Sequence, residues 1–378
     1  MPTPRGVYAG VAAATVMGQF GIIFAPFLLP FAMAHLGVEN LVASRLITCE
    51  LLVYLVTALV TSSPARFSAR PVAVIGCALY AAGSFATAMA SGVELFLLAR
   101  LFCGIGGGMA LVAANRATAS HHIYDRLFAV ALVTVIVVAV GSLVIVPTIY
   151  EQFGAWAAYT ALGTLAAAAA AISFGVRQGN RIVGSPRGLR FGAAAWLLVG
   201  AYFLSRLSDA ALWPYIETFG GRVGFGPSAV GVILAGTTLL SVVALLFALR
   251  IKAFGGIVAL FLCTLLAKAA VPLIMLLIPN QPSYVVAQII LAATVVLAGQ
   301  LFLTRLSLID SGGRLAGFGS TAGIAADTGG LPFTAEVFAA GSFAGVAALS
   351  AGIGVLALVI CVIAFASHVR SNLASEGA

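Results

Sequence analysis

Charged residues are scarce in this chain of 378 residues, at 8%, whereas about a quarter of the residues in a typical soluble domain are charged. Hydrophobic residues make up 62% and the mean hydropathy is +1.14. A soluble protein of this composition would expose apolar patches far larger than the few hundred Å² that solubility tolerates. The composition therefore excludes an ordinary soluble domain.

Several chemical motifs are also missing. None of the five cysteines has C-x-x-C spacing, and all lie in apolar stretches, which favours packing over a metal or redox role. No Walker-type glycine loop, H-E-x-x-H motif or nucleophile elbow is present, so the sequence predicts neither direct ATP drive nor an enzyme. His121 and His122 lie near Asp125 but lack further ligands. We expect no metal site and no cofactor.

Long apolar stretches dominate what is present, and each is close to the ~20 residues that cross a bilayer. The first is too long for a signal-peptide core, so we expect it to be retained as a span. Connections between the stretches are mostly too short to fold as soluble domains. The expected spans are 7–34, 40–62, 71–90, 94–116, 127–150, 154–176, 192–217, 227–249, 256–278, 283–304, 315–335 and 341–366.

Basic residues are distributed unevenly among the connections. The termini and even-numbered connections hold nearly all the loop arginines and lysines, whereas the odd-numbered ones hold only Arg222, with five glutamates that include Glu151 and Glu217. Cytoplasmic loops keep Lys and Arg, so both termini are expected in the cytoplasm. Because the basic residues lie in short cytoplasmic loops, the net charge of +8 favours contact with anionic lipid headgroups over binding of nucleic acid. The amino-acid composition, with more arginine than lysine and much alanine, indicates a protein of a bacterial inner membrane.

The chain shows signs of a twofold repeat with an offset of about 185–188 positions. Arg126-Leu127 opens the fifth expected span and Arg314-Leu315 opens the eleventh. Pro147 precedes Glu151 by four residues, as Pro332 precedes Glu336. We therefore expect an N-terminal six-helix bundle over 1–176, a cytoplasmic linker over 177–191, and a C-terminal six-helix bundle with a short cytoplasmic tail over 192–378.

One motif resembles a known family. In the fourth expected span, Arg100 is followed by glycines from Gly104 onward, which resembles the fourth-helix arginine motif of the major facilitator superfamily; Trp156 and the Trp213-Pro214-Tyr215 segment are similar to that superfamily too. The resemblance implies an all-α membrane protein of twelve transmembrane helices in two pseudo-symmetric six-helix bundles, with a central cavity and alternating access. The antiporter motif of the fifth span is reduced to Gly141 and Pro147, which argues against a standard drug–proton antiporter.

Ionisable residues at membrane depth are the main functional candidates, because each costs about 2.5–3.5 kcal/mol to insert. Arg100 stays cationic, so it is expected to hold an anion or tune a carboxylate, unless it only pins two helices. Burial and a nearby arginine shift a carboxyl's pKa in opposite directions, so Glu50 is a proton-coupling or substrate candidate. The alternative is a permanent ion pair. Arg45, five residues away, is a charge partner on a different helix face.

Arg206 and Asp209 lie at i and i+3 of the seventh expected span and so share a helix face. They are expected either to neutralise one another or to hold an anionic substrate at Arg206. Lys268 should point inward as a charge partner, and we expect it to pair with Asp327. Asp209 and Asp327 are further proton-coupling candidates.

Uncharged residues complete the expected site. Pro26 and Pro30 predict a kink in the first span, near Gln19 and Phe24. Polar side chains in spans can merely bridge helices, and aromatic residues near span ends can belong to an interfacial belt. The expected substrate-binding residues are Gln19, Phe24, Arg100, Arg206, Trp213 and Gln300.

These features predict a monomeric secondary active transporter that moves a small organic solute by alternating access with protons. Arg100, Arg206 and Lys268 favour an organic anion. One alternative is an efflux pump for amphipathic drugs or metabolites. Another is a non-transporting helper protein that keeps the fold.

Overall fold

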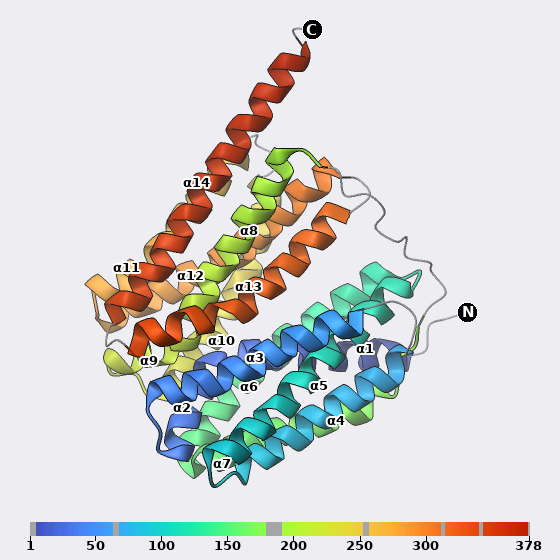
Figure 1. Cartoon of the computed structure of the whole chain (residues 1–378), viewed down its shortest axis with the longest axis vertical. Coiled ribbons are helices and arrows are strands. Elements are labelled where there is room, and N and C mark those ends of the chain that lie inside the picture. Colours follow the sequence, from blue (N-terminus) through green and yellow to red (C-terminus); the bar gives the residue numbers. More distant parts are fainter. Residues whose placement is uncertain are drawn as a thin grey trace. The chain divides into compact units, whose positions relative to one another are not determined.

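The computed structural model describes residues 5–62, 68–178, 191–251, 257–310, 314–339 and 343–376, and these ranges are almost entirely helical (Figure 1). The helices are α1 (Arg5–Ile23), α2 (Ala25–Leu36), α3 (Asn40–Ser62), α4 (Ala69–Ala88), α5 (Val93–Ser120), α6 (Tyr124–Phe153), α7 (Ala155–Ser173), α8 (Ala193–Leu212), the 3-10 turn η1 (Trp213–Tyr215), α9 (Ile216–Arg222), α10 (Pro227–Ile251), α11 (Ile257–Leu277), α12 (Gln281–Ile309), α13 (Arg314–Ala339) and α14 (Phe343–Glu376).

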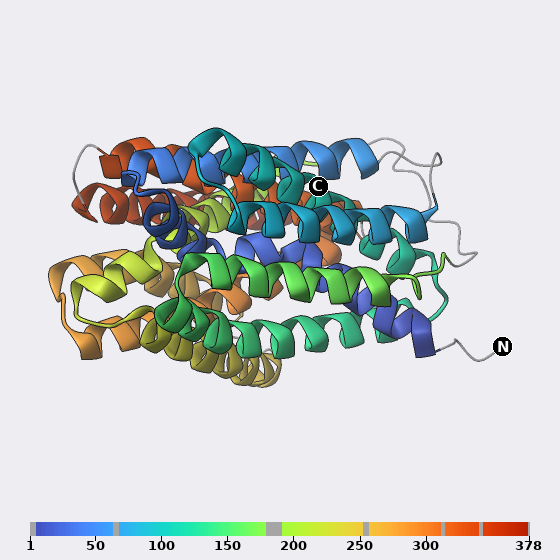
Figure 2. The same ribbon diagram turned by 90° about the horizontal axis from the view of Figure 1, so that it is seen from below.

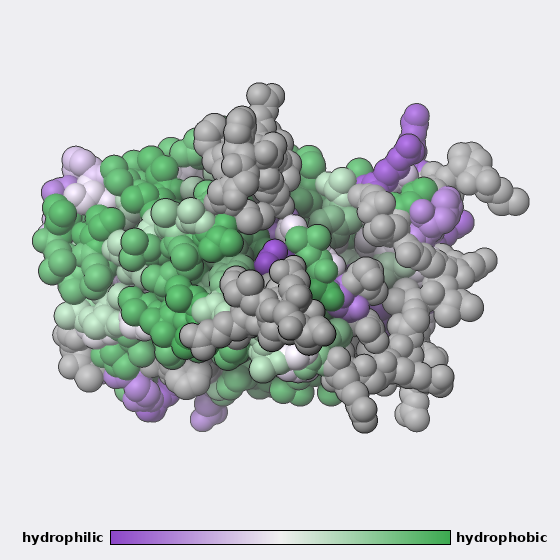
Figure 3. Space-filling model, turned by 90° about the horizontal axis from the view of Figure 1, so that it is seen from above, coloured by the Kyte–Doolittle hydropathy of each residue, from purple (hydrophilic) through white to green (hydrophobic). Residues whose placement is uncertain are grey.

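Ten of the described helices are long and apolar enough to cross a membrane, so the chain is an integral membrane protein. Most of the described side chains on the face shown in Figure 3 are hydrophobic. Of the remaining helices, α8 and α13 are 20 and 26 residues long. They carry Arg206, Asp209 and Asp327, so their lower apolarity coincides with the charges that the sequence singled out.

The kink predicted in the first span is confirmed. The helix breaks at Phe24 between α1 and α2, and Pro26 occupies the first turn of α2, where a missing N–H costs nothing. A similar break follows α8, where the 3-10 turn η1 contains Pro214. The two prolines are 188 positions apart, within the offset of the predicted repeat.

The chain divides into two compact units. The first comprises Met1–Gly184 together with Gly226–Ala235, the beginning of α10. Within it, α5 packs against α3, α4 and α1, while α4 also packs against α7. These neighbouring helices lie side by side in Figures 1 and 2. Small side chains such as Ala73, Ala113 and Ala117 fill the core and keep the helix axes close.

The second unit comprises Ser185–Phe225 and Gly236–Ala378. In this unit α8 packs against α13 and α14, and α11 packs against α12 and α14. Its core is aromatic as well as aliphatic, with the rings of Phe261 and Phe302 edge to face at 4.5 Å. The linker expected over 177–191 lies mostly outside the described residues. The predicted bundle boundaries therefore stay predictions.

Candidate functional site: two groups of buried charges

In the first unit, Glu50 of α3 and Arg100 of α5 form a bidentate ion pair. Arg100 Nε donates to Glu50 Oε2 at 2.8 Å, and Nη2 donates to Oε1 at 2.5 Å. The side chains are only 0% and 3% exposed for Arg100 and Glu50, respectively. A guanidinium matches a carboxylate in this fork geometry, so the pair is held in one arrangement.

Glycines on α5 allow this pairing. A Cβ at Gly104 would lie 2.3 Å from the Glu50 carbonyl oxygen, so only glycine lets the two backbones approach here. Gly106 allows the same close approach between α5 and α4, since a Cβ at this position would lie 2.5 Å from the Tyr80 backbone nitrogen. The glycines that follow Arg100 in the sequence therefore set the distance between α5 and α3. At this distance Arg100, one helical turn before Gly104, reaches Glu50.

Tyrosines surround the pair. The guanidinium carbon of Arg100 is 5.9 Å from the centre of the Tyr159 ring, within cation–π range. Tyr80 is fully buried on α4. Two fully buried polar atoms beside the pair, Arg100 Nη1 and Tyr80 Oη, have no hydrogen-bond partner.

In the second unit, four ionisable side chains from three helices form a charged cluster: Arg206 and Asp209 of α8, Lys268 of α11 and Asp327 of α13. Arg206 Nη2 donates to Asp327 Oδ2 at 2.6 Å. Arg206 Nη1 lies 3.9 Å from Asp209 Oδ2, and Lys268 Nζ lies 2.7 Å from the same oxygen. Two cations and two carboxylates balance, which offsets the cost of placing them at membrane depth.

The expected Arg206–Asp209 pair is confirmed as a contact, although at 3.9 Å it is the longest in the cluster. The expected Lys268–Asp327 pairing is corrected, because Lys268 contacts Asp209 while Asp327 contacts Arg206. Lys268 also donates a hydrogen bond to Ser205 Oγ at 2.7 Å. Asp209 Oδ2, although close to Lys268, has no aligned hydrogen-bond donor, so their contact is mainly one of charge.

The other predicted site residues lie apart from these contacts. Phe24 is fully buried at the break between α1 and α2, and its ring is tilted against that of Phe20 with ring centres 4.9 Å apart. Gln19 is half-buried on α1, and Arg45 is exposed on α3. The helix break places Trp213, half-buried, in η1, while Gln300 is exposed on α12. Their roles in substrate binding stay predictions.

Glu217 is a candidate that the sequence reasoning missed. This half-buried carboxylate lies in α9, beyond the end of α8, and burial raises the pKa of Glu217 to about 7. The nearby Tyr284 hydroxyl donates to the carbonyl of Ile216 at 3.1 Å. The signal in the sequence is a lone carboxylate one turn after the Trp213-Pro214 break.

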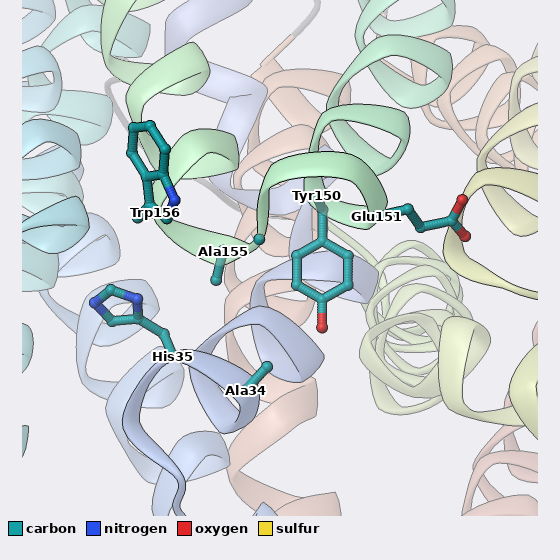
Figure 4. A pocket seen from close by; sticks show the side chains of 7 residues that line it. Ala34, His35, Tyr150, Glu151, Ala155 and Trp156 are labelled. Atoms are coloured by element: carbon teal, nitrogen blue, oxygen red, sulfur yellow. The ribbon is translucent and has the colours of Figure 1, made fainter.

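A cavity of about 500 Å³ opens where α2 ends, α6 ends and α7 begins (Figure 4). His35, Tyr150, Glu151 and Trp156 contribute its polar and aromatic lining. Glu151 is turned away from His35 and Trp156, and its carboxylate accepts hydrogen bonds from the backbone N–H of Ser228, at 2.9 Å, and from the Ser228 hydroxyl. Among the described residues, no group of three or more His, Cys, Asp or Glu side chains converges as a metal site.

Comparisons with known proteins bear on the fold. No protein-family model and no curated protein matches the chain. Solved structures do match. The POT family transporter PepTSo superimposes with a TM-score of 0.77 at 13% identity, over 97% of this chain and 99% of that one. A peptide transporter POT in complex with alafosfalin gives 0.75 at 12%, over 97% and 95%. An auto-inhibited POT family peptide transporter gives 0.76 at 11%, over 97% of each chain.

The matched structures belong to the major facilitator superfamily. Likeness along nearly the whole chain confirms the predicted all-α membrane fold of the major facilitator type. At these identities it establishes the fold alone, and function has to be argued from the site.

Proposed function

We propose that this chain is a proton-coupled secondary active transporter for a small organic solute that carries a carboxylate. The charged cluster of the second unit is the observation that carries the proposal. The side chains of Arg206, Asp209 and Asp327 are 22%, 11% and 14% exposed, so the protein covers these ions only in part, although they lie on helices of transmembrane length. Such residues in membrane proteins mark substrate and ion pathways.

The cluster offers a route for exchanging one carboxylate for another. A solute carboxylate binds Arg206 in place of Asp327, because both present the same planar anion to the guanidinium. Displacement leaves Asp327 without its cation, and proton uptake removes that uncompensated charge. Solute binding and proton binding are thereby linked at one residue.

The Glu50–Arg100 pair supplies a second proton site. Among the described residues its carboxylate pairs with a single arginine, so a proton on Glu50 breaks this salt bridge and frees Arg100 to rearrange. Two discrete arrangements of buried side chains are what a transport cycle needs. Glu50 therefore acts as the proton carrier, with Arg100 controlling when the proton binds.

Small peptides are the first solutes to test. The matched structures are named peptide transporters, and a peptide carries a carboxylate at one end and an ammonium at the other. The cluster provides Arg206 for the carboxylate and Asp209 for an ammonium group.

The remaining expectations belong to the same proposal. The protein functions as a monomer in a bacterial inner membrane, with both termini in the cytoplasm and contacts to anionic lipid. The two six-helix halves expected over 1–176 and 192–378 provide alternating access.

Proteoliposome uptake tests the proposal. Liposomes with an alkaline interior receive a panel of carboxylates, di- and tripeptides, sugars and amphipathic drugs. We expect a carboxylate-bearing solute to accumulate above its external concentration and to leak out when a protonophore is added. Transport restricted to uncharged amphipathic drugs would favour the efflux-pump alternative. No movement of any solute under any gradient would favour the non-transporting helper.

A further inference from the structure

Two glycines one turn apart on α1 differ in what surrounds them. A Cβ at Gly18 would lie 2.7 Å from the backbone of Leu111, so close packing requires glycine there. A Cβ at Gly21 would instead lie 3.4 Å from Glu50 Oε1 and 4.0 Å from Tyr80 Oη, with nothing else within 4 Å. Gly21 is only half-buried. Packing therefore does not account for this glycine, whose missing side chain leaves a methyl-sized space beside a buried carboxylate.

Polar atoms around this space lack partners. Tyr80 Oη and Arg100 Nη1 are both fully buried, and neither makes a hydrogen bond of normal geometry. Buried polar atoms in native proteins are nearly always satisfied, by protein or by ordered water. A buried water needs two to four polar partners and a roomy site, and the space at Gly21 offers Glu50 Oε1 and Tyr80 Oη.

We propose that Gly21 is a water portal: the missing side chain admits water that bridges Glu50 Oε1 and Tyr80 Oη and connects this carboxylate to the aqueous phase. Tyr80 is a positioning residue that holds the water. The role of this portal in proton transfer rests on the proposed function, in which Glu50 is the proton carrier. Whether water enters at Gly21 does not depend on that proposed function.

The proton step balances through this water. The bridging water gives a proton to Glu50 Oε1. The bridging water then receives a proton from the next water in the hydrogen-bonded chain that leads to the aqueous phase. Arg100 keeps its charge, so the protonated pair carries one net positive charge. The titratable groups that face Glu50 are Arg100 and Cys103 on α5, Tyr80 on α4 and Tyr159 on α7. Of the elements around the carboxylate, α1 contributes Gly21, which has no side chain to exclude water.

Thiol labelling of the reconstituted full chain tests whether the position is wet. The variant Gly21→Cys is treated with a small, positively charged methanethiosulfonate, and modification is followed by peptide mass spectrometry. Val137→Cys is the control, because Val137 is 64% exposed on an apolar helix and a thiol facing lipid excludes a charged reagent. We expect labelling roughly tenfold faster at position 21 than at position 137. Equal rates would overturn the portal.

Proton access is measured separately by infrared spectroscopy. The protonated Glu50 carbonyl band shifts after transfer to heavy water, and Glu50→Gln identifies the band. We expect slower exchange in Gly21→Ala, slower still in Gly21→Val, and slower exchange in Tyr80→Phe. The matched control is Gly141→Val, a half-buried helical glycine whose Cβ would meet nothing within 4 Å.

The outcomes separate the two proposals. Unchanged exchange in a folded Gly21→Val protein would overturn the portal as a proton route. If no variant shows a protonated Glu50 band, the proton-carrier role in the proposed function is wrong, and thiol labelling alone then decides whether water enters at Gly21. Thermal unfolding of each variant confirms that it is folded before comparison.

Discussion

The two groups of buried charges differ in how completely they are sealed. The pair in the first unit has two members, bidentate geometry and side chains exposed by no more than 3%. The cluster in the second unit has four members, mostly single contacts, and an arginine whose side chain is 22% exposed. A buried pair with no room for a solute can still bind a proton, because a proton can reach it along a hydrogen-bonded chain of water molecules. A more open cluster of four ions suits a solute.

Packing explains the difference. Glycines on α5 draw the backbones of α3 and α4 together around Glu50 and Arg100, which leaves no room for an organic molecule. Around the cluster, α8 and α13 also approach closely, since a Cβ at Gly330 would lie 2.3 Å from the Ala210 backbone, but the ionic contacts themselves are made by long side chains that reach across three helices. Long side chains can be displaced without moving a helix axis, whereas backbone contacts cannot.

Removing the arginine of the sealed pair should have the largest effect. Arg100→Leu leaves a buried carboxylate without its cation, and breaking such a pair destabilises a protein by about 3–5 kcal/mol. Unfolding in mixed micelles measures the loss. Adding Glu50→Gln to Arg100→Leu should recover part of it, because the uncompensated charge is then gone. The control Arg45→Leu, at an exposed position of α3, should cost about 1 kcal/mol or less. Equal losses for the two single variants would contradict the sealed pair.

Substitution within the cluster should weaken solute binding more than folding. Arg206→Lys keeps the charge but loses the guanidinium fork, and a hydrogen bond to a charged group contributes about 1.5–3 kcal/mol. We expect solute affinity to fall roughly ten- to a hundredfold, read as a smaller solute-induced shift in melting temperature. Arg305→Lys, on α12 of the same unit, should keep wild-type affinity. A normal shift in Arg206→Lys would remove Arg206 from the solute site.

The smallest effect is expected at Glu217, outside both groups. Its pKa is raised from an ordinary value near 4.5 to about 7, so its contribution to folding stability is greatest below pH 4.5 and declines as pH rises through 7. Glu217→Gln should abolish this decline. Trp213, one turn earlier, reports the change by fluorescence in a background with Trp156→Phe and Trp196→Phe. A titration near pH 7 that survives in Glu217→Gln would assign it to another group.

Much of the fold could be predicted from the sequence, because span length and loop charge depend on local composition. The break at Phe24 followed from two prolines, and the Arg206–Asp209 contact followed from helical spacing alone. Pairing between helices was harder. Glu50 and Arg100 are 50 positions apart, and their contact depends on Gly104 meeting one particular backbone. The partner of Lys268 was predicted wrongly for the same reason, since sequence does not fix which carboxylate a long side chain reaches.

The central claim is that a proton on Glu50 travels with the solute. Liposomes loaded with a pH-sensitive dye report proton entry when solute is added outside, while radiolabelled solute reports its own movement. Wild type should carry both together, whereas Glu50→Gln should carry fewer protons per solute than wild type and accumulate less solute under a pH gradient, because only the Asp327 proton site remains. Proton entry in Glu50→Gln that matches wild type, solute for solute, would contradict the account.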